Sequence, residues 1–410
     1  MLGRLAWRNL GRNRRRTGLT AAAGAFAALL MMLALALARG SHEYWIDQSV
    51  RLYPGHVRLA LAGYEEHGTL EYGMRLSPAL RSALDALPGS VGWAPRLETW
   101  GLAVQDADGS LGRGAWIVGV DPERERELTR LFDGLGSAEL PEPGAPGAVL
   151  GADLARALGV RTGESILLLT GDYYGSQAAE RFRVTGTLSV GDPRFDERAV
   201  LTHVGDMQAF LDAGRTVSHV VLFAPTGERA DDLARELSAS LPGGYEILTW
   251  PELVPDLLQM LLLDDAGNWL SLSILVVVVG FGLLNTVLMS VLERRREFGT
   301  LRALGMRPRA VFGLVLIESL LLTSAGIAAG LAIAVPLLLV LERNPIPLTG
   351  EQLAAAVETY HLDPVLVFDL SAAQLLGTSA VLLVVALMAA LPPALRAARG
   401  QPREAMREPT

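Results

Sequence analysis

The chain has 410 residues, half of them hydrophobic, and a formal net charge of −8 at neutral pH. It contains no cysteine, which excludes a disulfide framework and thiolate chemistry. All 36 basic residues are arginine, so the chain has no lysine with which to build a nucleotide-binding phosphate loop.

Charge is distributed unevenly along the chain. Residues 40–265 carry 34 acids against 18 arginines, whereas the rest of the chain carries 10 acids against 18 arginines. The basic residues flank apolar runs and do not form a patch on a folded domain, so the pattern does not indicate nucleic-acid binding. An acidic region and a basic remainder predict that the two parts of the chain lie in different environments.

Four apolar stretches are long enough to cross a lipid bilayer as helices of about 20 residues. The first, residues 18–38, follows a basic segment, so a cleaved signal peptide is the alternative interpretation, although the run is long for one. We therefore expect an α-helical membrane protein with four transmembrane helices. An α+β extracytoplasmic domain should lie between the first and second spans.

The positions of arginine predict the orientation of these spans in an inner (cytoplasmic) membrane. Residues 1–17 and 293–309 carry six arginines each, whereas residues 342–370 carry one arginine and five acids. Because arginine concentrates on the cytoplasmic side, both termini are expected there. The expected order is a cytoplasmic amphipathic helix over 1–17, a span over 18–38, an external domain over 39–266, a span over 267–292, a cytoplasmic helix over 293–309, a span over 310–341, an external loop over 342–370, a span over 371–391 and a cytoplasmic tail over 392–410.

Strand-like and helix-like segments alternate in the external domain. The predicted strands are 57–62, 115–120, 165–170, 180–189, 217–223 and 245–249. The predicted helices are 78–87, 122–131, 152–158, 206–212 and 230–241. Asp121 and Pro122 have the pattern of a helix N-cap followed by proline at the first helical position. Residues 141–147 are expected as a linker, and the β-rich part over 163–204 as an insertion.

The helix that contains the second span is expected to be longer than a membrane is thick. A helix from Asp256 to Leu292 would measure about 55 Å, whereas the hydrocarbon core measures about 30 Å. Its external stalk is unusually apolar, which favours packing against the stalk of the first span or, as the sharper alternative, a wall for acyl chains. The candidate substrate-facing residues are Leu258, Met260, Leu261, Leu262 and Trp269.

The sequence offers no catalytic or metal-binding motif. The six histidines show no i, i+3 or i+4 pairing, and neither His-Glu-x-x-His nor Gly-x-Ser-x-Gly occurs. We therefore expect no catalytic residue, no metal and no cofactor on this chain.

Residues 285–305, NTVLMSVLERRREFGTLRALG, are the most informative stretch. Phe298, Leu301 and Leu304 are spaced at i, i+3 and i+6, which predicts the apolar ridge of a short helix. Gly305 is placed as its C-cap, and Pro308 begins the next helix. Such a ridge fits a groove in a partner protein, and the alternative is a helix that lies on lipid.

This stretch resembles the coupling segment of MacB/FtsX-type permeases, the type VII ABC transporters. Trp7-Arg8-Asn9-Leu10 resembles the family's N-terminal helix, and residues 392–408 resemble its tail. Glu318, followed by Gly326 and Gly330, resembles the third span. In the external domain, the segments 55–57, 94–96 and 118–123 resemble the lipoprotein-releasing LolC/LolE branch.

The resemblance implies a permease without its own ATPase site. Two permease chains, identical or paralogous, would work with two copies of a separate ABC ATPase that binds ATP and Mg²⁺. The implied contact residues are Glu293, Arg296, Glu297, Phe298, Leu301, Arg302, Leu304 and Gly305. Glu318 is an intramembrane carboxylate, which is a functional candidate by default, but a structural hydrogen bond is the favoured interpretation.

Three functions remain open within the family. The leading hypothesis is extraction of lipoproteins from the inner membrane for handover to a soluble periplasmic carrier. The second is MacB-like export of a drug, peptide or toxin from the periplasm through an adaptor. The third is an FtsX-like signalling scaffold that activates a cell-wall hydrolase. The sequence does not identify the cargo.

Overall fold

A computed structural model describes residues 14–88, 91–105, 111–135, 143–347 and 365–399. Contacts divide these residues into two units. The helical unit comprises residues up to 42, from 261 to 347 and from 365 onward, and the α/β unit comprises residues from 43 to 260. The motif at Trp7–Leu10 and most of the expected loop over 342–370 and tail over 392–410 lie outside the described residues.

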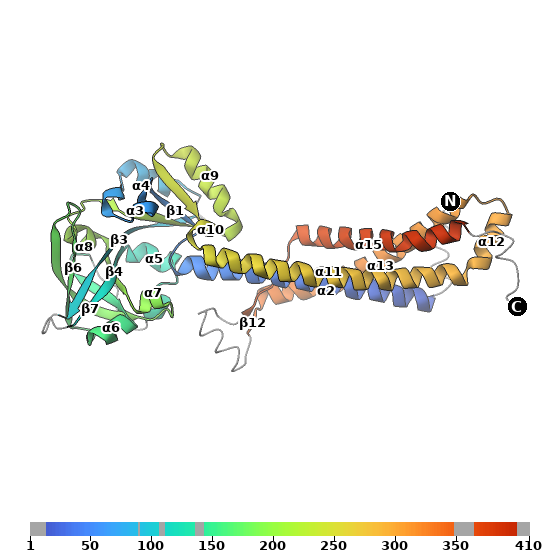
Figure 1. Ribbon diagram of the computed structural model, residues 1–410, viewed down its shortest axis with the longest axis horizontal. Helices are drawn as coiled ribbons and strands as arrows, with labels where there is room; N and C mark the ends of the chain where they lie inside the picture. The colour runs from blue at the N-terminus through green and yellow to red at the C-terminus, as the bar shows by residue number, and fades with distance from the viewer. Residues whose placement is uncertain (1–13, 89–90, 106–110, 136–142, 348–364, 400–410) are drawn as a thin grey trace. The chain divides into compact units, whose positions relative to one another are not determined.

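Four long helices dominate the helical unit (Figure 1). They are α2 (Arg14–Leu52), α11 (Pro255–Glu293), α13 (Pro308–Arg343) and α15 (Ala372–Arg399). Each is long and apolar enough to cross a membrane, which confirms the expected four transmembrane helices. The 39 residues of α11 correspond to about 58 Å of helix, so the predicted long helix is also confirmed. The short helix α12 (Arg295–Ala303) joins α11 to α13, and β12 (Ile346–Pro347) pairs with β13 (Val365–Leu366).

Small residues allow α2 and α13 to pack closely. A Cβ atom added to Gly330 would lie 2.5 Å from the carbonyl oxygen of Ala25, and one added to Gly326 would lie 2.8 Å from that of Ala21. Glycines four residues apart are a common way to bring helix backbones together in membranes, where hydrophobic burial does not drive helix association. All four long helices contribute to one cluster, which contains Ala28, Met31, Leu272, Ile327 and Leu382.

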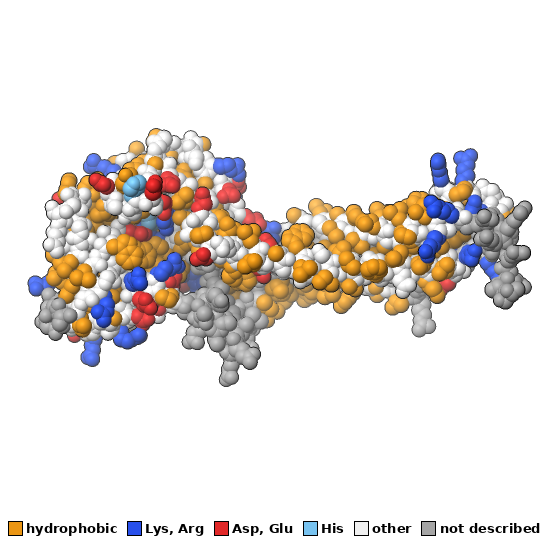
Figure 2. Space-filling view, viewed as in Figure 1, with side chains coloured by type: hydrophobic (Ala, Val, Ile, Leu, Met, Phe, Trp, Pro, Cys, Tyr) orange, Lys and Arg blue, Asp and Glu red, His pale blue; other side chains and the backbone are white. Residues whose placement is uncertain are grey.

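The fourth span was expected to end at Pro392, but α15 continues through Pro392 and Pro393 to Arg399. Proline lacks a backbone donor, so the helix loses hydrogen bonds at both positions. Burial of Ala394 and Ala397 against α11 and α13 stabilises the last turns. Figure 2 shows hydrophobic side chains along the length of this unit and arginines gathered at one end.

The α/β unit is built on one nine-stranded sheet, in the order β11-β1-β10-β3-β4-β8-β5-β7-β6. An additional pairing of β3 with β6 closes six of the strands into a barrel. The strands are β1 (Val57–Leu61), β3 (Gly92–Gln105), β4 (Gly112–Val120), β5 (Gly147–Gly151), β6 (Ser165–Gly171), β7 (Gln177–Leu188), β8 (Ala199–His203), β10 (His219–Phe223) and β11 (Tyr245–Thr249), with the short pair β2 (Met74–Arg75) and β9 (Thr216–Val217) beside them.

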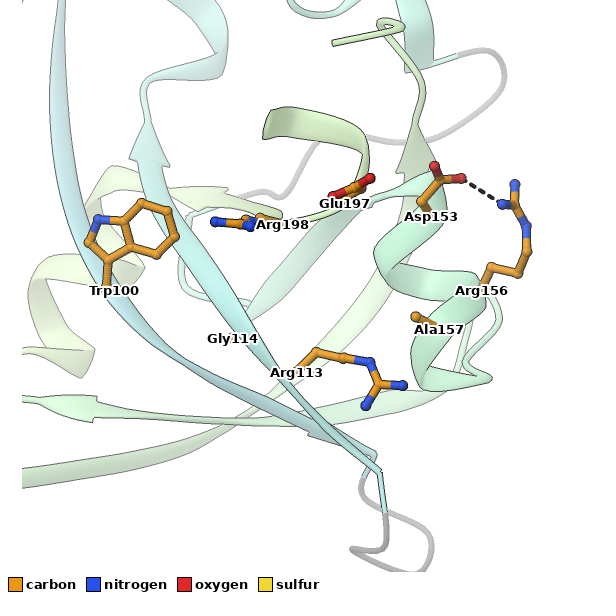
Figure 3. Close-up of a pocket in the computed structure, with 8 residues that line it drawn as sticks. All are labelled: Trp100, Arg113, Gly114, Asp153, Arg156, Ala157, Glu197 and Arg198. Carbon is orange, nitrogen blue, oxygen red and sulfur yellow. Dashed lines mark hydrogen bonds and ion pairs between the residues drawn. The ribbon is translucent and has the colours of Figure 1, made fainter. Parts of the chain in front are cut away.

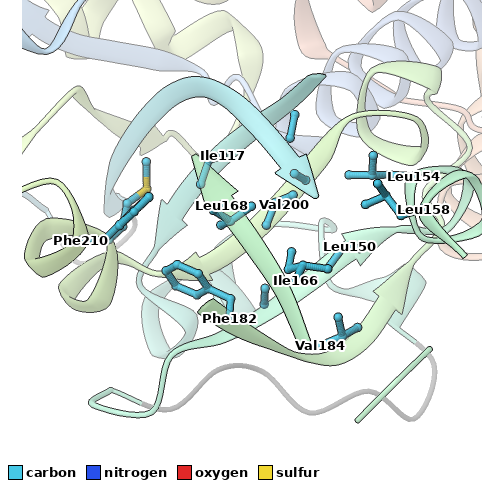
Figure 4. Packing of buried hydrophobic residues seen from close by; sticks show 14 of the residues in the cluster. Ile117, Leu150, Leu154, Leu158, Ile166, Leu168, Phe182, Val184, Val200 and Phe210 are labelled. Carbon is cyan, nitrogen blue, oxygen red and sulfur yellow. The ribbon is translucent and has the colours of Figure 1, made fainter. Parts of the chain in front are cut away.

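The strand β3 belongs to both parts of the sheet. Its residues 92–96 pair with β10, and its residues 97–105 pair with β4 and β6. The barrel interior holds the largest apolar core of the unit, including Ile117, Leu168, Phe182 and Val200 (Figure 4). The part over 163–204, expected as an insertion, supplies three of the six barrel strands.

Short helices cover the sheet. They are α3 (Tyr64–His67), α4 (Pro78–Asp85), α5 (Pro122–Leu128), α6 (Ala152–Leu158), α7 (Pro193–Asp196), α8 (Val204–Phe210), α9 (Ala230–Ser240) and α10 (Trp250–Leu253). The predicted N-cap of α5 is confirmed, since the Asp121 side chain accepts a hydrogen bond from the Arg124 backbone amide and Pro122 follows it. The strands β3, β5 and β8 were not predicted from the sequence.

Candidate functional site

The helix α12 lies between two long spans and has defined ends. Arg294 is its N-cap residue, and Gly305 follows its C-cap with φ of +97°. The amide of Met306 donates to the carbonyl of Leu301 at 3.0 Å, and the amide of Gly305 donates to that of Arg302 at 3.1 Å. This pair of bonds is the Schellman motif, in which glycine adopts the left-handed conformation without a steric penalty. Pro308 then begins α13, as predicted.

The three residues of the predicted apolar ridge have different surroundings. Phe298 is only 4% exposed and packs with Val291, Val311 and Leu314 of its own chain, so it cannot fill a groove in a partner. Leu301 is partly buried against the same cluster. Leu304 is 80% exposed. The expectation of one continuous ridge is therefore wrong, because residues six apart lie about 120° apart around a helix and α12 already ends at Ala303.

The outward surface of α12 and its flanks is mainly polar. Its exposed members are Glu293, Arg295, Arg296, Thr300, Ala303, Leu304 and Gly305, and Arg307 and Arg309 follow in the chain. Glu297 and Arg302 are partly buried. Any partner of this segment therefore meets an arginine-rich surface with Leu304 as an exposed apolar side chain.

Arg294 connects the short helix to the third span. Its Nη1 donates to both carboxylate oxygens of Glu318 at 2.8 Å, and its Nε donates to Glu297 at 2.9 Å. Its guanidinium also lies 5.2 Å from the centre of the Phe298 ring. The bond expected for Glu318 is thus an ion pair with Arg294. Arg294 was not predicted from the sequence, because nothing in the run of three arginines at 294–296 distinguishes the first one.

A second polar cluster lies at the opposite end of the apolar stretches. Arg39 of α2 pairs with Asp369, whose backbone amide donates to the carbonyl of Ala36 at 3.0 Å. His42 of α2 contacts Asp264 of α11, with Nε2 and Oδ2 2.7 Å apart. In α2, residues 18–38 precede this cluster and correspond to about 31 Å of helix, close to the thickness of a hydrocarbon core.

The candidate stalk residues face in different directions. Leu261 is buried and Leu258 is partly buried, whereas Met260, Leu262 and Trp269 are exposed. The stalk therefore combines a packed side with an exposed apolar side. In the described ranges, no group of three or more His, Asp or Glu side chains is arranged to hold a metal ion.

Comparison with known families identifies the chain. The MacB-like periplasmic core domain family matches residues 17–240, which is more than half of the chain, and the FtsX-like permease C-terminal family matches residues 269–402. The chain belongs to the MacB/FtsX family of ABC transporter permeases. It is therefore a multi-pass permease of the inner membrane, and a permease of an ABC transporter implies an ATPase partner.

Relatives in the MacB/FtsX family include two lipoprotein-releasing system transmembrane proteins named LolC. The one from Xylella fastidiosa (strain 9a5c) is 28% identical over 329 residues, which are 78% of this chain and 78% of the relative. The one from Neisseria meningitidis serogroup B is 23% identical over 309 residues, 72% and 73% of the two chains. The extracellular domain of the noncanonic transporter YknZ from Gram-positive bacteria covers 47% of this chain and 99% of its own, at 11% identity and a TM-score of 0.34, too weak a similarity to support an argument.

Proposed function

We propose that this permease releases lipoproteins from the outer leaflet of the inner membrane, driven by ATP hydrolysis on a separate subunit. The observation that carries this proposal is the similarity to LolC proteins, which extends over 78% of this chain and of the Xylella relative. The external motifs at 55–57, 94–96 and 118–123 support the same branch of the family.

The proposed contact with the ATPase is the exposed surface of α12 and its flanks, centred on Leu304. Glu293, Arg296 and Leu304 would meet the partner, and Arg302 and Glu297 would set its position. Phe298 and Leu301 support that surface from inside the chain. ATP and Mg²⁺ would bind to the ATPase alone, because this chain has no lysine for a phosphate loop.

Arg294 would transmit motion of the ATPase contact to the membrane spans. A displacement of α12 would act on Glu318 through the ion pair and on the neighbouring spans through Phe298. Both α11 and α13 begin or end beside α12, so the two helices would move with it. We infer that Glu318 has a positioning role and does not bind cargo.

The proposed topology places both termini and α12 in the cytoplasm and the α/β unit outside. Arginines gather at the α12 end of the helical unit, whereas Asp264, Asp265 and Asp369 lie at the other end. This asymmetry follows the preference of arginine for the cytoplasmic side. The complete transporter would contain two permease chains, identical or paralogous, and two ATPase copies, with a periplasmic carrier as acceptor.

The exposed side of the stalk would contact the acyl chains of the cargo. Met260, Leu262 and Trp269 present apolar side chains there, and Leu258 and Leu261 stiffen the helix from its packed side. Apolar surface of this kind gains about 25 cal/mol per Å² when an acyl chain covers it.

Reconstitution tests the proposal. The permease and its ATPase, placed in proteoliposomes with a fluorescent acylated lipoprotein, should transfer that lipoprotein to a soluble carrier only when ATP is supplied. The same lipoprotein without its acyl chains is the control and should show no ATP-dependent transfer. A complex that hydrolyses ATP and moves a drug or peptide, yet releases no lipoprotein, would refute the assignment.

A further inference from the structure

The α/β unit contains a cavity of about 1,060 Å³ that the proposed mechanism does not use. Sites for small molecules occupy roughly 300–1,000 Å³, so this cavity is slightly larger than most of them. Its walls are the last turn of α2 with Pro54, the segment 189–198, and Leu253 with Val254. These first and last segments are where the chain enters the α/β unit from α2 and leaves it toward α11.

Aromatic rings form the floor of the cavity. The ring of Tyr53 meets those of Trp116 and Phe195 edge to face, with centroids 4.9 Å and 5.2 Å apart, and Trp116 and Phe195 are 5.2 Å apart. Trp100 stacks on Trp116 at 6.3 Å and is 61% exposed. Aromatic pairs in these geometries are rigid and favourable. Tyr53 and Phe195 are 6% and 2% exposed, so they support the floor from below, and Trp116 and Trp100 supply the ring surface that a ligand can reach.

Four arginines and three carboxylates line the cavity. Arg130 pairs with Asp133 at 3.2 Å and Arg194 with Asp192 at 2.6 Å, so these four charges compensate one another. The remaining carboxylate, Glu98, accepts a hydrogen bond from the Tyr53 hydroxyl. Burial raises the pKa of Tyr53 and keeps this donor neutral.

Of the other two arginines, Arg58 is paired with Glu65 and Arg198 is available to an anion. The Nη1 of Arg58 donates to Glu65 at 2.9 Å, but its Nε is buried without a hydrogen-bond partner in the described part of the chain. Arg198 is exposed, and no ion pair within the described residues involves it. Because the Nε of Arg58 has no accessible surface, a ligand oxygen would bind the exposed Arg198.

The wall beside the arginines is held in place by Asp196. Its carboxylate is buried and accepts hydrogen bonds from the amides of Val190 and Gly191 at 3.0 and 3.1 Å and from the hydroxyl of Ser189 at 3.1 Å. The loop that borders the cavity is thus fixed by bonds to a charged acceptor, which are stronger than bonds between neutral groups.

A second hollow of about 880 Å³ shares Trp100 and Arg198 with the cavity (Figure 3). Arg113, Arg156, Asp153 and Glu197 also line it, and Arg156 pairs with Asp153 at 2.6 Å. The lining of each hollow contains one more arginine than carboxylates. This second hollow would take a solvated group that projects from a ligand in the cavity.

We propose that the cavity binds an anionic amphiphile, with an alkyl chain over the Trp100 and Trp116 rings and a carboxylate or phosphate at Arg198. A free anion would leave Trp100 uncovered, and a neutral lipid would leave Arg198 without an acceptor. Such a ligand would touch both segments through which the chain enters and leaves the unit, and would link them. This inference does not depend on which cargo the transporter moves.

Photolabelling of the full-length chain in phosphatidylcholine nanodiscs tests the proposal. The probes are hexadecanoate and hexadecanol, each carrying the same diazirine in its alkyl chain. Mass spectrometry should find hexadecanoate on residues of the cavity wall, such as Leu253 and Val254, at least five times more often than hexadecanol. Equal labelling by the two probes, or labelling of the wall no greater than that of the exposed helix α9, would overturn the proposal.

Two variants and two competitors sharpen this test. Arg198→Gln should reduce labelling by hexadecanoate severalfold and leave labelling by hexadecanol unchanged, and Ser49→Trp should reduce both by filling the cavity. The matched control is Arg235→Gln, which changes an exposed arginine of α9. Lysophosphatidylglycerol should displace the probe, whereas inorganic phosphate at the same concentration should not. Displacement by phosphate alone, or loss of labelling in Arg235→Gln, would contradict an amphiphile site.

Discussion

The two units of this permease differ in where their charged side chains lie. The α/β unit buries an ion pair completely, since Arg96 and Glu125 are both 0% exposed, and it also buries His56 and His219. The described ion pairs of the helical unit lie toward the ends of the apolar stretches, at Arg39 and His42 on one side and at Arg294 on the other. The α/β unit thus holds a charged pair and two histidine rings in its core. In the helical unit, small residues let the helix backbones approach.

The largest expected effect breaks the buried pair of the α/β unit. Glu125→Leu should cost about 3–5 kcal/mol, because Arg96 would keep its charge in the core without a partner. Hydrogen exchange should show faster opening of β3 peptides and no change in α13 peptides.

The double variant Arg96→Met, Glu125→Leu is the control, because it also removes the charge that Glu125→Leu leaves without a partner. It should recover much of the stability, since apolar residues can replace a buried pair at little cost. If the double variant is as unstable as Glu125→Leu, the pair stabilises the fold by more than the compensation of its two charges.

The next effect is a pH dependence confined to the α/β unit. Burial lowers the pKa of His56 to about 4 from 6.5, and burial also holds the pKa of His219 below its usual value. The unfolded chain therefore binds protons first as the pH falls from 6.5 toward 4. The stability is complete above pH 6.5 and decreases below it, by up to about 3 kcal/mol for His56.

Hydrogen exchange at several pH values, corrected for intrinsic exchange rates, measures this dependence. Peptides of β1 and β10 should lose protection as the pH falls, and α13 peptides should not. His56→Leu should flatten the slope, whereas His67→Gln, which changes an exposed histidine, should leave it unchanged. A slope of equal size in α13 would contradict the difference between the units.

A smaller effect is expected from the close packing of the helical unit. Gly330→Leu places atoms where the Ala25 carbonyl now lies, so α2 and α13 must separate, at a cost of about 1–3 kcal/mol. Gly377→Leu makes the same change on α15, where nothing lies within 4 Å of the added Cβ. Thermal unfolding in detergent should be lowered by the first variant only, and equal shifts would count against the packing argument.

These comparisons also show what the sequence could predict. Spans, the long helix α11 and helix ends such as Asp121-Pro122 were predictable, because they depend on local composition and capping. The strand β3 was not, because it contains Gly92, Pro95 and Gly101 and is stabilised by different neighbours along its length.

The sequence predicted which segment forms the candidate ATPase contact, but it did not predict the side-chain contacts of that segment. The spacing of Phe298 and Leu304 indicated one apolar ridge, and only the packing of α12 on the spans separates a buried residue from an exposed one. The importance of Arg294 depends on Glu318, which is 24 residues away in the chain. The cavity of the α/β unit joins segments about 200 residues apart, from Gln48 to Val254.

The ion pair at Arg294 provides a test with a moderate expected effect on transport. Arg294→Met removes the bonds to Glu297 and Glu318, so ATP-driven release should fall about tenfold, while binding of the ATPase should change less than twofold. Arg396→Met, an exposed arginine of α15, is the matched control. A loss of ATPase binding as large as the loss of release would mean that Arg294 acts at the contact itself.

We propose that the exposed surface around Leu304 binds the ATPase, and the affinity between the purified subunits measures this contact directly. Leu304→Asp should weaken binding about thirtyfold or more, the effect of removing a central apolar anchor worth 2 kcal/mol. Insertion and folding should be preserved because Leu304 is 80% exposed. Leu111→Asp, at an exposed leucine of the α/β unit, should bind normally. An unchanged affinity for the Leu304→Asp permease, together with full stimulation of ATP hydrolysis, would contradict the account.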